Sequence, residues 1–354
     1  MDASGVLGFL VDRFRRENLN RQILDVAVDD DSMTAAPIED GKGYFRLWAR
    51  RMFLSRERDW FHGQYPTVQS FLTFDFGGET DQVTVAHAAG PDHLASVDEN
   101  HLNRVIQVNH LLTGLVPFRG GSVKVETAMV ATKIDDDLTR FLNVVGDFSK
   151  LVSVPQLSLA IDVASKVTDG VKQLAHADGN NLVTGFTGTF VGTNETRSDR
   201  DYVLRNSLFL ALNAPASDFQ RGELRFRDGQ VTYHDAPLEG VDWLLLEIET
   251  ATKRDNIIDS FPSISEPFEK AVDALQRVTN NDTSAADALV RSALVVALNS
   301  DDLIETDRRR AVDEIKERYR DRKQALLEPL GVDNGRGETF PGIAESDLAA
   351  MLEV

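Results

Sequence analysis

Between residues 66 and 255, hydrophobic residues recur mainly at every second position. In the segment VQSFLTFDF, one face would carry Val68, Ser70, Leu72, Phe74 and Phe76. The same period of two returns in residues 82–87, 104–112, 122–133 and 182–192, and around Leu210. Such alternation predicts strands with one face in a core. The segment VDWLLLEIET (241–250) is almost continuously apolar, which predicts a central strand.

The segment ELRFRDGQVTYH predicts a hairpin in its own right. Asp228 and Gly229 form the residue pair preferred in a type I′ turn. A two-residue loop there places Phe226 opposite Val231 and Leu224 opposite Tyr233. All four apolar residues then share one face, so the turn and the strand register agree.

Helical periodicity appears in four parts of the chain. The segment 5–23 and the segment from Tyr44 to Glu57 each carry an apolar stripe beside several arginines. Residues 135–177 predict two helices inserted between strands. After Pro262, helices are predicted over 266–278, 284–298 and 300–327, with a short one possible at 345–352.

These elements predict an α+β protein built on an antiparallel β-sandwich of about eight strands with a two-helix insertion. The expected parts are N-terminal helices with an acidic linker (1–65), the sandwich (66–255), a C-terminal helical module (262–330) and a flexible tail (331–354).

Composition narrows the class of protein. The chain is 42% hydrophobic and 27% charged, which is typical of a globular protein. Its net charge of −19 disfavours non-specific binding to nucleic acid. Because the chain has no cysteine, disulfides, thiolate catalysis and Cys-ligated metals are excluded. The N-terminus lacks the pattern of a signal peptide, and no apolar run reaches the roughly 18 residues of a membrane span. These features lead us to expect a cytoplasmic protein.

Histidines offer one candidate for chemistry. Four of the seven fall between residues 87 and 110, and His87 and His110 both occupy predicted inward positions on strands. Together with a nearby carboxylate they could bind a metal ion, which would suit a metal-dependent hydrolase. Their spacing matches no zinc signature, and inward histidines also bond neighbouring carbonyl groups.

Carboxylates and nucleophiles give little support for an enzyme. Glu247 and Glu249 are two residues apart on a strand, so they point the same way, as acid/base pairs do. The preferred interpretation is a strand end that faces solvent. The chain has no GxSxG or SxxK nucleophile motif and no glycine-rich phosphate loop before a helix. No cofactor is therefore expected.

Aromatic and basic residues suggest a contact surface instead. Tyr44, Trp48, Arg51 and Trp60 are candidates for binding a protein partner, because such residues are enriched in interfaces. The alternative is a helix that packs its aromatic residues on the sheet and pairs its arginines with acidic groups.

One further interpretation concerns membranes. The insertion 135–177 lies between two alternating strands, and this layout resembles that of pore-forming proteins of the perforin and gasdermin kinds, without any family motif. The sequence as a whole favours a non-enzymatic protein-binding or adaptor protein. A metal-dependent hydrolase and a membrane-active protein are the alternatives.

Overall fold

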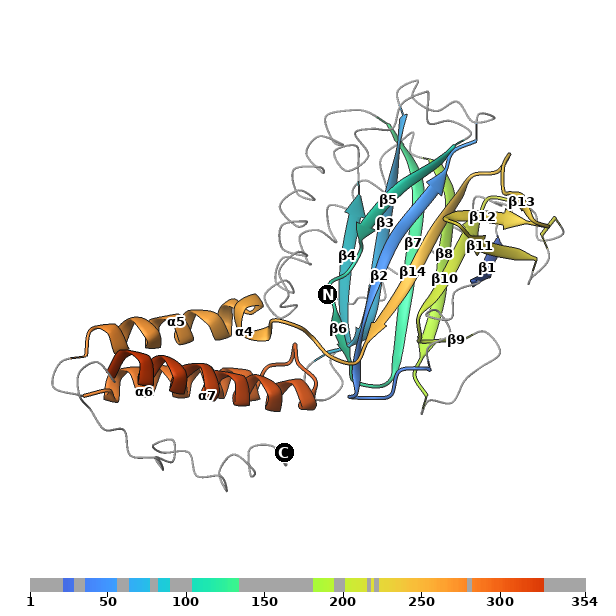
Figure 1. Cartoon of the computed structure of the whole chain (residues 1–354). Coiled ribbons are helices and arrows are strands. Elements are labelled where there is room, and N and C mark those ends of the chain that lie inside the picture. The colour runs from blue at the N-terminus through green and yellow to red at the C-terminus, as the bar shows by residue number, and fades with distance from the viewer. Residues whose placement is uncertain are drawn as a thin grey trace. The chain divides into compact units, whose positions relative to one another are not determined.

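The computed structural model describes residues 22–28, 36–55, 64–76, 82–89, 104–133, 181–193, 201–214, 218–219, 223–278 and 282–327 (Figure 1). The insertion 135–177, Trp60, the tail 331–354 and most of the helix predicted at 5–23 lie outside these residues. Compact packing divides the chain into two units, Met1–Thr252 and Lys253–Val354, which are taken in turn.

The described part of the first unit contains two sheets. One has nine strands, in the order β13-β12-β11-β1-β10-β14-β2-β5 with β6 also paired to β2, and the other has the order β4-β3-β7-β8-β9. All pairs are antiparallel except β1–β11 and β8–β9. The strands are β1 (Gln22–Val28), β2 (Gly43–Phe53), β3 (Gln64–Asp75), β4 (Gln82–Ala89), β5 (Val105–Leu111), β6 (Val116–Phe118), β7 (Ser122–Lys133), β8 (Asn181–Val191), β9 (Tyr202–Val203), β10 (Ser207–Leu212), β11 (Leu224–Arg227), β12 (Gln230–Tyr233), β13 (Ala236–Pro237) and β14 (Trp243–Ala251).

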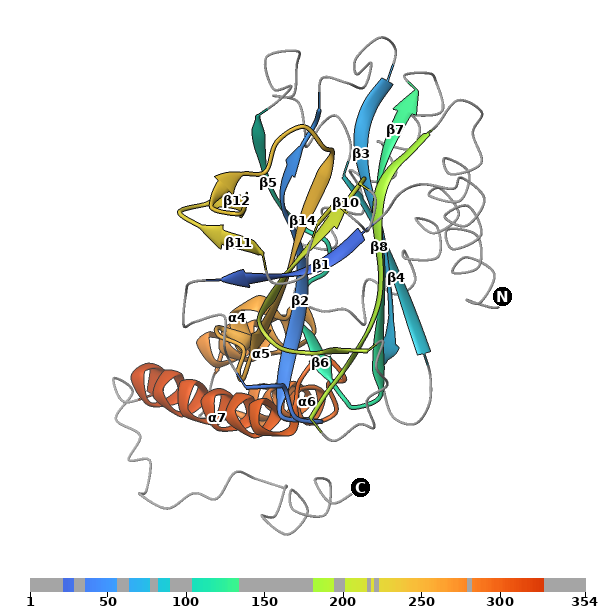
Figure 2. The same ribbon diagram turned by 90° about the vertical axis from the view of Figure 1, so that its right-hand side faces the viewer.

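A core of aromatic and aliphatic side chains joins the two sheets, which form adjacent layers in Figure 2. Phe45 of β2 meets Phe74 of β3 edge-on, with ring centroids 5.7 Å apart. Phe190 of β8 likewise meets Phe209 of β10 at 5.1 Å. The α+β class and the mostly antiparallel pairing are therefore confirmed. The described residues form fourteen strands, more than the eight expected after residue 66, because β1 and β2 lie before that residue and β6, β9 and β13 are short strands of two or three residues.

The hairpin of β11 and β12 forms with the predicted register. Leu224 pairs with Tyr233 and Phe226 with Val231, and the turn residues Asp228 and Gly229 both have positive φ, at 50° and 77°. Its apolar residues join a second core on the outer face of the nine-stranded sheet. That core also contains Phe53, Leu208, Leu210, Leu212, Leu238, Trp243 and Leu245.

The helix predicted from Tyr44 to Glu57 is wrong, since Gly43–Phe53 form strand β2. Phe45, Leu47 and Ala49 are buried on one side of this strand, while Arg46 and Trp48 between them are partly exposed. An apolar stripe of period 3.6 can be drawn through the same residues. Here β2 lies between β14 and the strands β5 and β6, and this pairing determines the conformation.

Helices make up the described part of the second unit. They are α4 (Ile257–Ser260), α5 (Pro262–Gln276), α6 (Ser284–Leu298) and α7 (Glu305–Leu327), and they share one apolar core. Helix α6 has the predicted bounds. Helix α7 begins at Glu305 and not at Ser300, and Leu303 and Ile304 in the preceding turn are fully buried. None of the helices in the described residues has the length and apolar character needed to cross a membrane.

Candidate functional site

A β-bulge places three arginines of strand β2 near one face of the nine-stranded sheet. Ala49 pairs with Leu246 of β14, but the next pair is Arg51 with Leu245, so Arg50 is the additional residue. Arg46, Trp48 and Arg51 share the face opposite to the main core. An additional residue in one strand redirects the side chains around it. The bulge therefore allows Arg50 to join the same face, beside Trp48.

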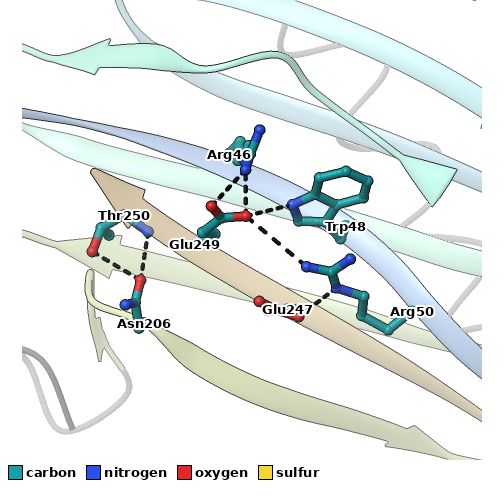
Figure 3. Close-up of polar contacts among 7 residues, drawn as sticks. All are labelled: Arg46, Trp48, Arg50, Asn206, Glu247, Glu249 and Thr250. Atoms are coloured by element: carbon teal, nitrogen blue, oxygen red, sulfur yellow. Dashed lines mark hydrogen bonds and ion pairs between the residues drawn. The ribbon is translucent and has the colours of Figure 1, made fainter. Parts of the chain in front are cut away.

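Strands β2 and β14 together build a network that we call the Trp48 ladder, made of Arg46, Trp48, Arg50, Glu247 and Glu249 (Figure 3). Arg46 donates two hydrogen bonds to Glu249, from Nε at 2.8 Å and from Nη2 at 2.5 Å. Trp48 Nε1 donates to the same carboxylate at 2.9 Å. Arg50 donates to Glu247, and its Nη2 lies 3.9 Å from Glu249.

The indole ring of Trp48 also contacts both guanidinium groups of the ladder. The Cζ atom of Arg46 is 5.0 Å from the ring centroid, and that of Arg50 is 4.2 Å from it. These distances are within the range of cation–π attraction. The ladder thus fixes Trp48 by one hydrogen bond at its edge and by two cations against its ring. At the end of β14, Asn206 Oδ1 accepts hydrogen bonds from the backbone N–H and the hydroxyl of Thr250 (Figure 3).

Solvent reaches this face in part. The side chains of Arg46 and Glu249 are 32% and 30% exposed, and those of Arg50 and Glu247 are 26% and 14% exposed. Burial alone would raise the pKa of Glu249, but the hydrogen bonds and charges of Arg46, Trp48 and Arg50 outweigh it and hold that pKa below its ordinary value. Glu249 therefore stays ionised at neutral pH.

The chemistry of the ladder favours contact over catalysis. A general acid or base needs a pKa near the working pH and a free path to a substrate. Glu249 has a lowered pKa, and both of its oxygens already accept hydrogen bonds. A metal ion would have to displace Arg46 from Glu249 and Arg50 from Glu247. Arg46 uses only two of the five N–H groups of a guanidinium within the ladder, so further donors remain for a partner.

Of the residues predicted to bind a partner and described by the structure, Trp48 alone belongs to the ladder. Tyr44 is fully buried. Arg51 donates to the carbonyl of Gly229 in the hairpin turn and lies over the ring of Phe226, 5.3 Å from its centroid. Arg51 therefore fastens the hairpin to the sheet, while Trp60 lies outside the described residues.

Glu247 and Glu249 were expected at a strand end that faces solvent. Both side chains are partly exposed, and the structure adds that each accepts hydrogen bonds from an arginine of β2. Glu249 pairs directly with Arg46 across the two strands, and Glu247 pairs with Trp48. The signal was present in the sequence as an alternation of Arg46, Trp48 and Arg50 with apolar residues. It becomes visible only when Gly43–Phe53 is recognised as a strand, since in a helix Trp48 would lie on the side opposite to Arg46 and Arg50.

The two histidines proposed as metal ligands lie on different sheets. His87 is on β4, opposite Ser70, and His110 is on β5, opposite Ala49. The described residues contain no group of three His, Asp or Glu side chains able to hold a metal ion, and the side chain of His87 is not among those described. The metal site stays a prediction.

Comparison with known proteins identifies no relative of this chain. No protein-family model, curated protein or solved structure matches the chain. The function therefore has to be inferred from the residues of the site.

Proposed function

We propose that this chain is a non-enzymatic protein-binding protein, built on a β-sandwich scaffold, and that the Trp48 ladder is the centre of its contact surface. The observation that carries the proposal is the position of Trp48, held between Arg46 and Arg50 on a partly exposed sheet face. Tryptophan and arginine are the residues most enriched among those that dominate binding energy in interfaces.

Preorganisation strengthens this proposal. Binding normally costs the rotamer freedom of long side chains at the interface. In the ladder, hydrogen bonds to Glu249 and Glu247 already restrict Arg46, Trp48 and Arg50 before any partner arrives. The remaining guanidinium N–H groups suit a partner that offers carbonyl or carboxylate oxygens beside an apolar side chain.

The test is affinity capture from a lysate of the native host with three forms of the chain: wild type, Trp48→Ala and Arg104→Ala. Arg104 is an exposed arginine outside the ladder and serves as the matched control. We expect at least one protein to be retained by wild type and Arg104→Ala and to bind Trp48→Ala at least about tenfold more weakly. Thermal unfolding of each form verifies that the fold is intact. Equal retention of all proteins by folded Trp48→Ala would contradict the proposal.

A membrane-active protein is the second candidate, supported by the pairing of β7 with β8. These strands pair antiparallel from Ser122–Val191 to Ala131–Asn181, so residues 134–180 connect two adjacent strand ends. This is the layout in which pore-forming proteins keep segments that later enter a membrane. Release of a trapped dye from anionic liposomes, by the chain both intact and after limited proteolysis, would support it. Failure of both forms to release dye would exclude it.

A further inference from the structure

The outward side of helix α6 carries no charge, although α5 and α7, which share its core, have charged outer sides. The exposed residues of α6 are Ser284, Ala285, Ala288, Ser292 and Val295. Those of α5 are Glu266, Glu269, Lys270, Asp273 and Gln276. A helix on a protein surface normally presents charged and polar residues to water. Val295, at 37% exposure, is one of two exposed large hydrophobic residues in the described part of the chain.

These uncharged positions continue along the whole helix as one surface. We call it the α6 stripe, and it consists of Ala285, Ala288, Leu289, Ser292, Val295, Val296 and Asn299. Residues three, four and seven apart lie on the same side of a helix, and this spacing is the one at which two helices pack along their length. Leu289 and Val296 are half-buried at the margin of the stripe, where they also contact the core of the helical unit.

The two charged residues of α6 lie away from the stripe. Asp287 accepts a hydrogen bond from the hydroxyl of Tyr319 on α7 at 2.7 Å, and it lies 3.5 Å from Nζ of Lys323. Arg291 follows one turn later on the same side of α6, and its Nε donates to the carbonyl of Asp287 at 3.4 Å. Helix α7 therefore takes up the charged side of α6, and the stripe stays neutral.

We propose that the α6 stripe is the contact between two copies of this chain, which pair through α6 in antiparallel orientation about a two-fold axis at Ser292. A symmetric contact requires a surface that complements itself. Reversal of the stripe about Ser292 exchanges Ala285 with Asn299, Ala288 with Val296, and Leu289 with Val295. Each alanine then lies opposite a larger side chain, an arrangement that lets two helices approach closely and interdigitate.

Charge limits where two copies can meet. With a net charge of −19, two copies repel each other at long range. A contact through the neutral stripe brings no like charges together, and a partner recognised by its charge would find no counter-charge there. The stripe lies on the helical unit and the Trp48 ladder on a sheet of the first unit, so this proposal is independent of the proposed function.

The size of the stripe predicts a weak dimer. At 1.5 Å per residue it is about 21 Å long, and a helix is about 10 Å wide. This is less than the roughly 800 Å² that each partner buries in a stable interface, so we expect a Kd on the order of 10–100 µM. Because salt screens the repulsion between the copies, the dimer should tighten several-fold between about 0.05 and about 0.5 M NaCl.

Sedimentation velocity of the purified wild-type chain tests for the dimer. Measured between about 5 and about 500 µM, the average mass should rise from that of one chain toward that of two. Higher salt should shift this transition to lower concentration. A monomer at every concentration and salt would overturn the proposal, whatever other protein binds the stripe.

The variants Ser292→Glu and Gln276→Glu locate the contact. Ser292→Glu places a carboxylate of each copy at the two-fold axis, and we expect dimerisation to weaken at least about tenfold. Gln276→Glu adds the same charge at an exposed position of α5 and should dimerise as wild type. Thermal unfolding verifies that both variants are folded. A dimer of unchanged affinity in Ser292→Glu would overturn the assignment to α6.

Single cysteines determine the orientation of the helices, since the chain has no cysteine of its own. A disulfide requires Cα atoms within about 7 Å, so Ser292→Cys should crosslink to itself on mild oxidation at least about tenfold faster than Gln276→Cys. Ala285→Cys should not crosslink to itself, but should do so to Asn299→Cys in a mixture. Rapid self-crosslinking of Ala285→Cys, or equal rates for Ser292→Cys and Gln276→Cys, would overturn the antiparallel pairing.

Discussion

The outer faces of the two sheets treat polar side chains in opposite ways. On the nine-stranded sheet, every charged group of the Trp48 ladder is paired, and the ladder is partly exposed. On the five-stranded sheet, Gln69 and Glu126 are almost completely buried and have unpartnered atoms. Polar side chains on the two sheets of one fold thus differ in whether hydrogen bonds and water compensate their burial.

The difference shows why polarity alone does not describe a surface. In the ladder, water and hydrogen bonds both compensate the charges, so ionisation is favoured and the pKa of Glu249 is lowered. At Glu126 burial removes water and the Oε2 atom has no hydrogen-bond partner, and burial raises the pKa to about 7. The ladder keeps its charges at neutral pH, which suits a contact surface, whereas Glu126 changes its charge near pH 7.

The largest expected effect is the pH dependence caused by Glu126. A carboxyl group whose pKa rises from 4.5 to about 7 on folding makes the native state bind more protons. Its stabilising effect is complete below about pH 4.5 and is lost as the pH rises to about 7. We expect the free energy of unfolding of wild type to fall by up to about 3 kcal/mol over this range relative to Glu126→Gln. Urea unfolding at several pH values measures it.

Glu249→Gln serves as a control for that measurement, because Glu249 should change the free energy of unfolding with pH in the opposite direction. Because the folded-state pKa of Glu249 is lowered, its contribution is present above the ordinary pKa and is lost as the pH falls through the lowered value. The effect should stay below about 1 kcal/mol, because the side chain is partly solvated. If both variants changed with pH in the same direction, the contrast between the two faces would be wrong.

Loss of the ladder carboxylate should have the next largest effect. Glu249→Ala leaves Arg46 and the Trp48 N–H without their acceptor, and we expect the free energy of unfolding to decrease by about 1–2 kcal/mol. Glu39→Ala removes an exposed carboxylate paired with Lys42 and should cost less than about 0.5 kcal/mol. Chemical denaturation at pH 7.5 compares them. Equal effects of the two substitutions would show that the ladder contributes nothing to stability.

The smallest effect is expected from replacing the buried amide of Gln69. Unlike the substitution of Glu249, this change should stabilise the protein. Gln69→Leu removes two unpartnered polar atoms from a buried position and keeps a similar volume, so it should stabilise the protein by about 1 kcal/mol at pH 7.5. Gln107→Leu, at an exposed position of β5, should leave the stability nearly unchanged. A lower melting temperature for Gln69→Leu would mean that the amide has a partner in solution.

The sequence predicted the elements whose local signals agree with one another. The Asp228-Gly229 turn and the alternation beside it fixed the hairpin register, and the bounds of β7 and α6 were predicted to the residue. Strand β2 was missed, because its apolar residues fit a helix as well as a strand. The site was missed in part for the same reason, since Glu247 and Glu249 find their partners only on that strand.

By itself, the sequence determined which apolar residues of the predicted strands enter a core, because alternation and turn chemistry act over a few neighbouring positions. Only the tertiary structure decided which polar residues are paired and which are left alone. Trp48 and Glu126 both follow the alternation of their strands, yet Trp48 donates a hydrogen bond to Glu249 while the Oε2 atom of Glu126 has no hydrogen-bond partner. The reason is that a hydrogen bond depends on residues up to about two hundred positions away, as with Trp48 and Glu249. No local sequence pattern encodes a contact between residues so far apart in the chain.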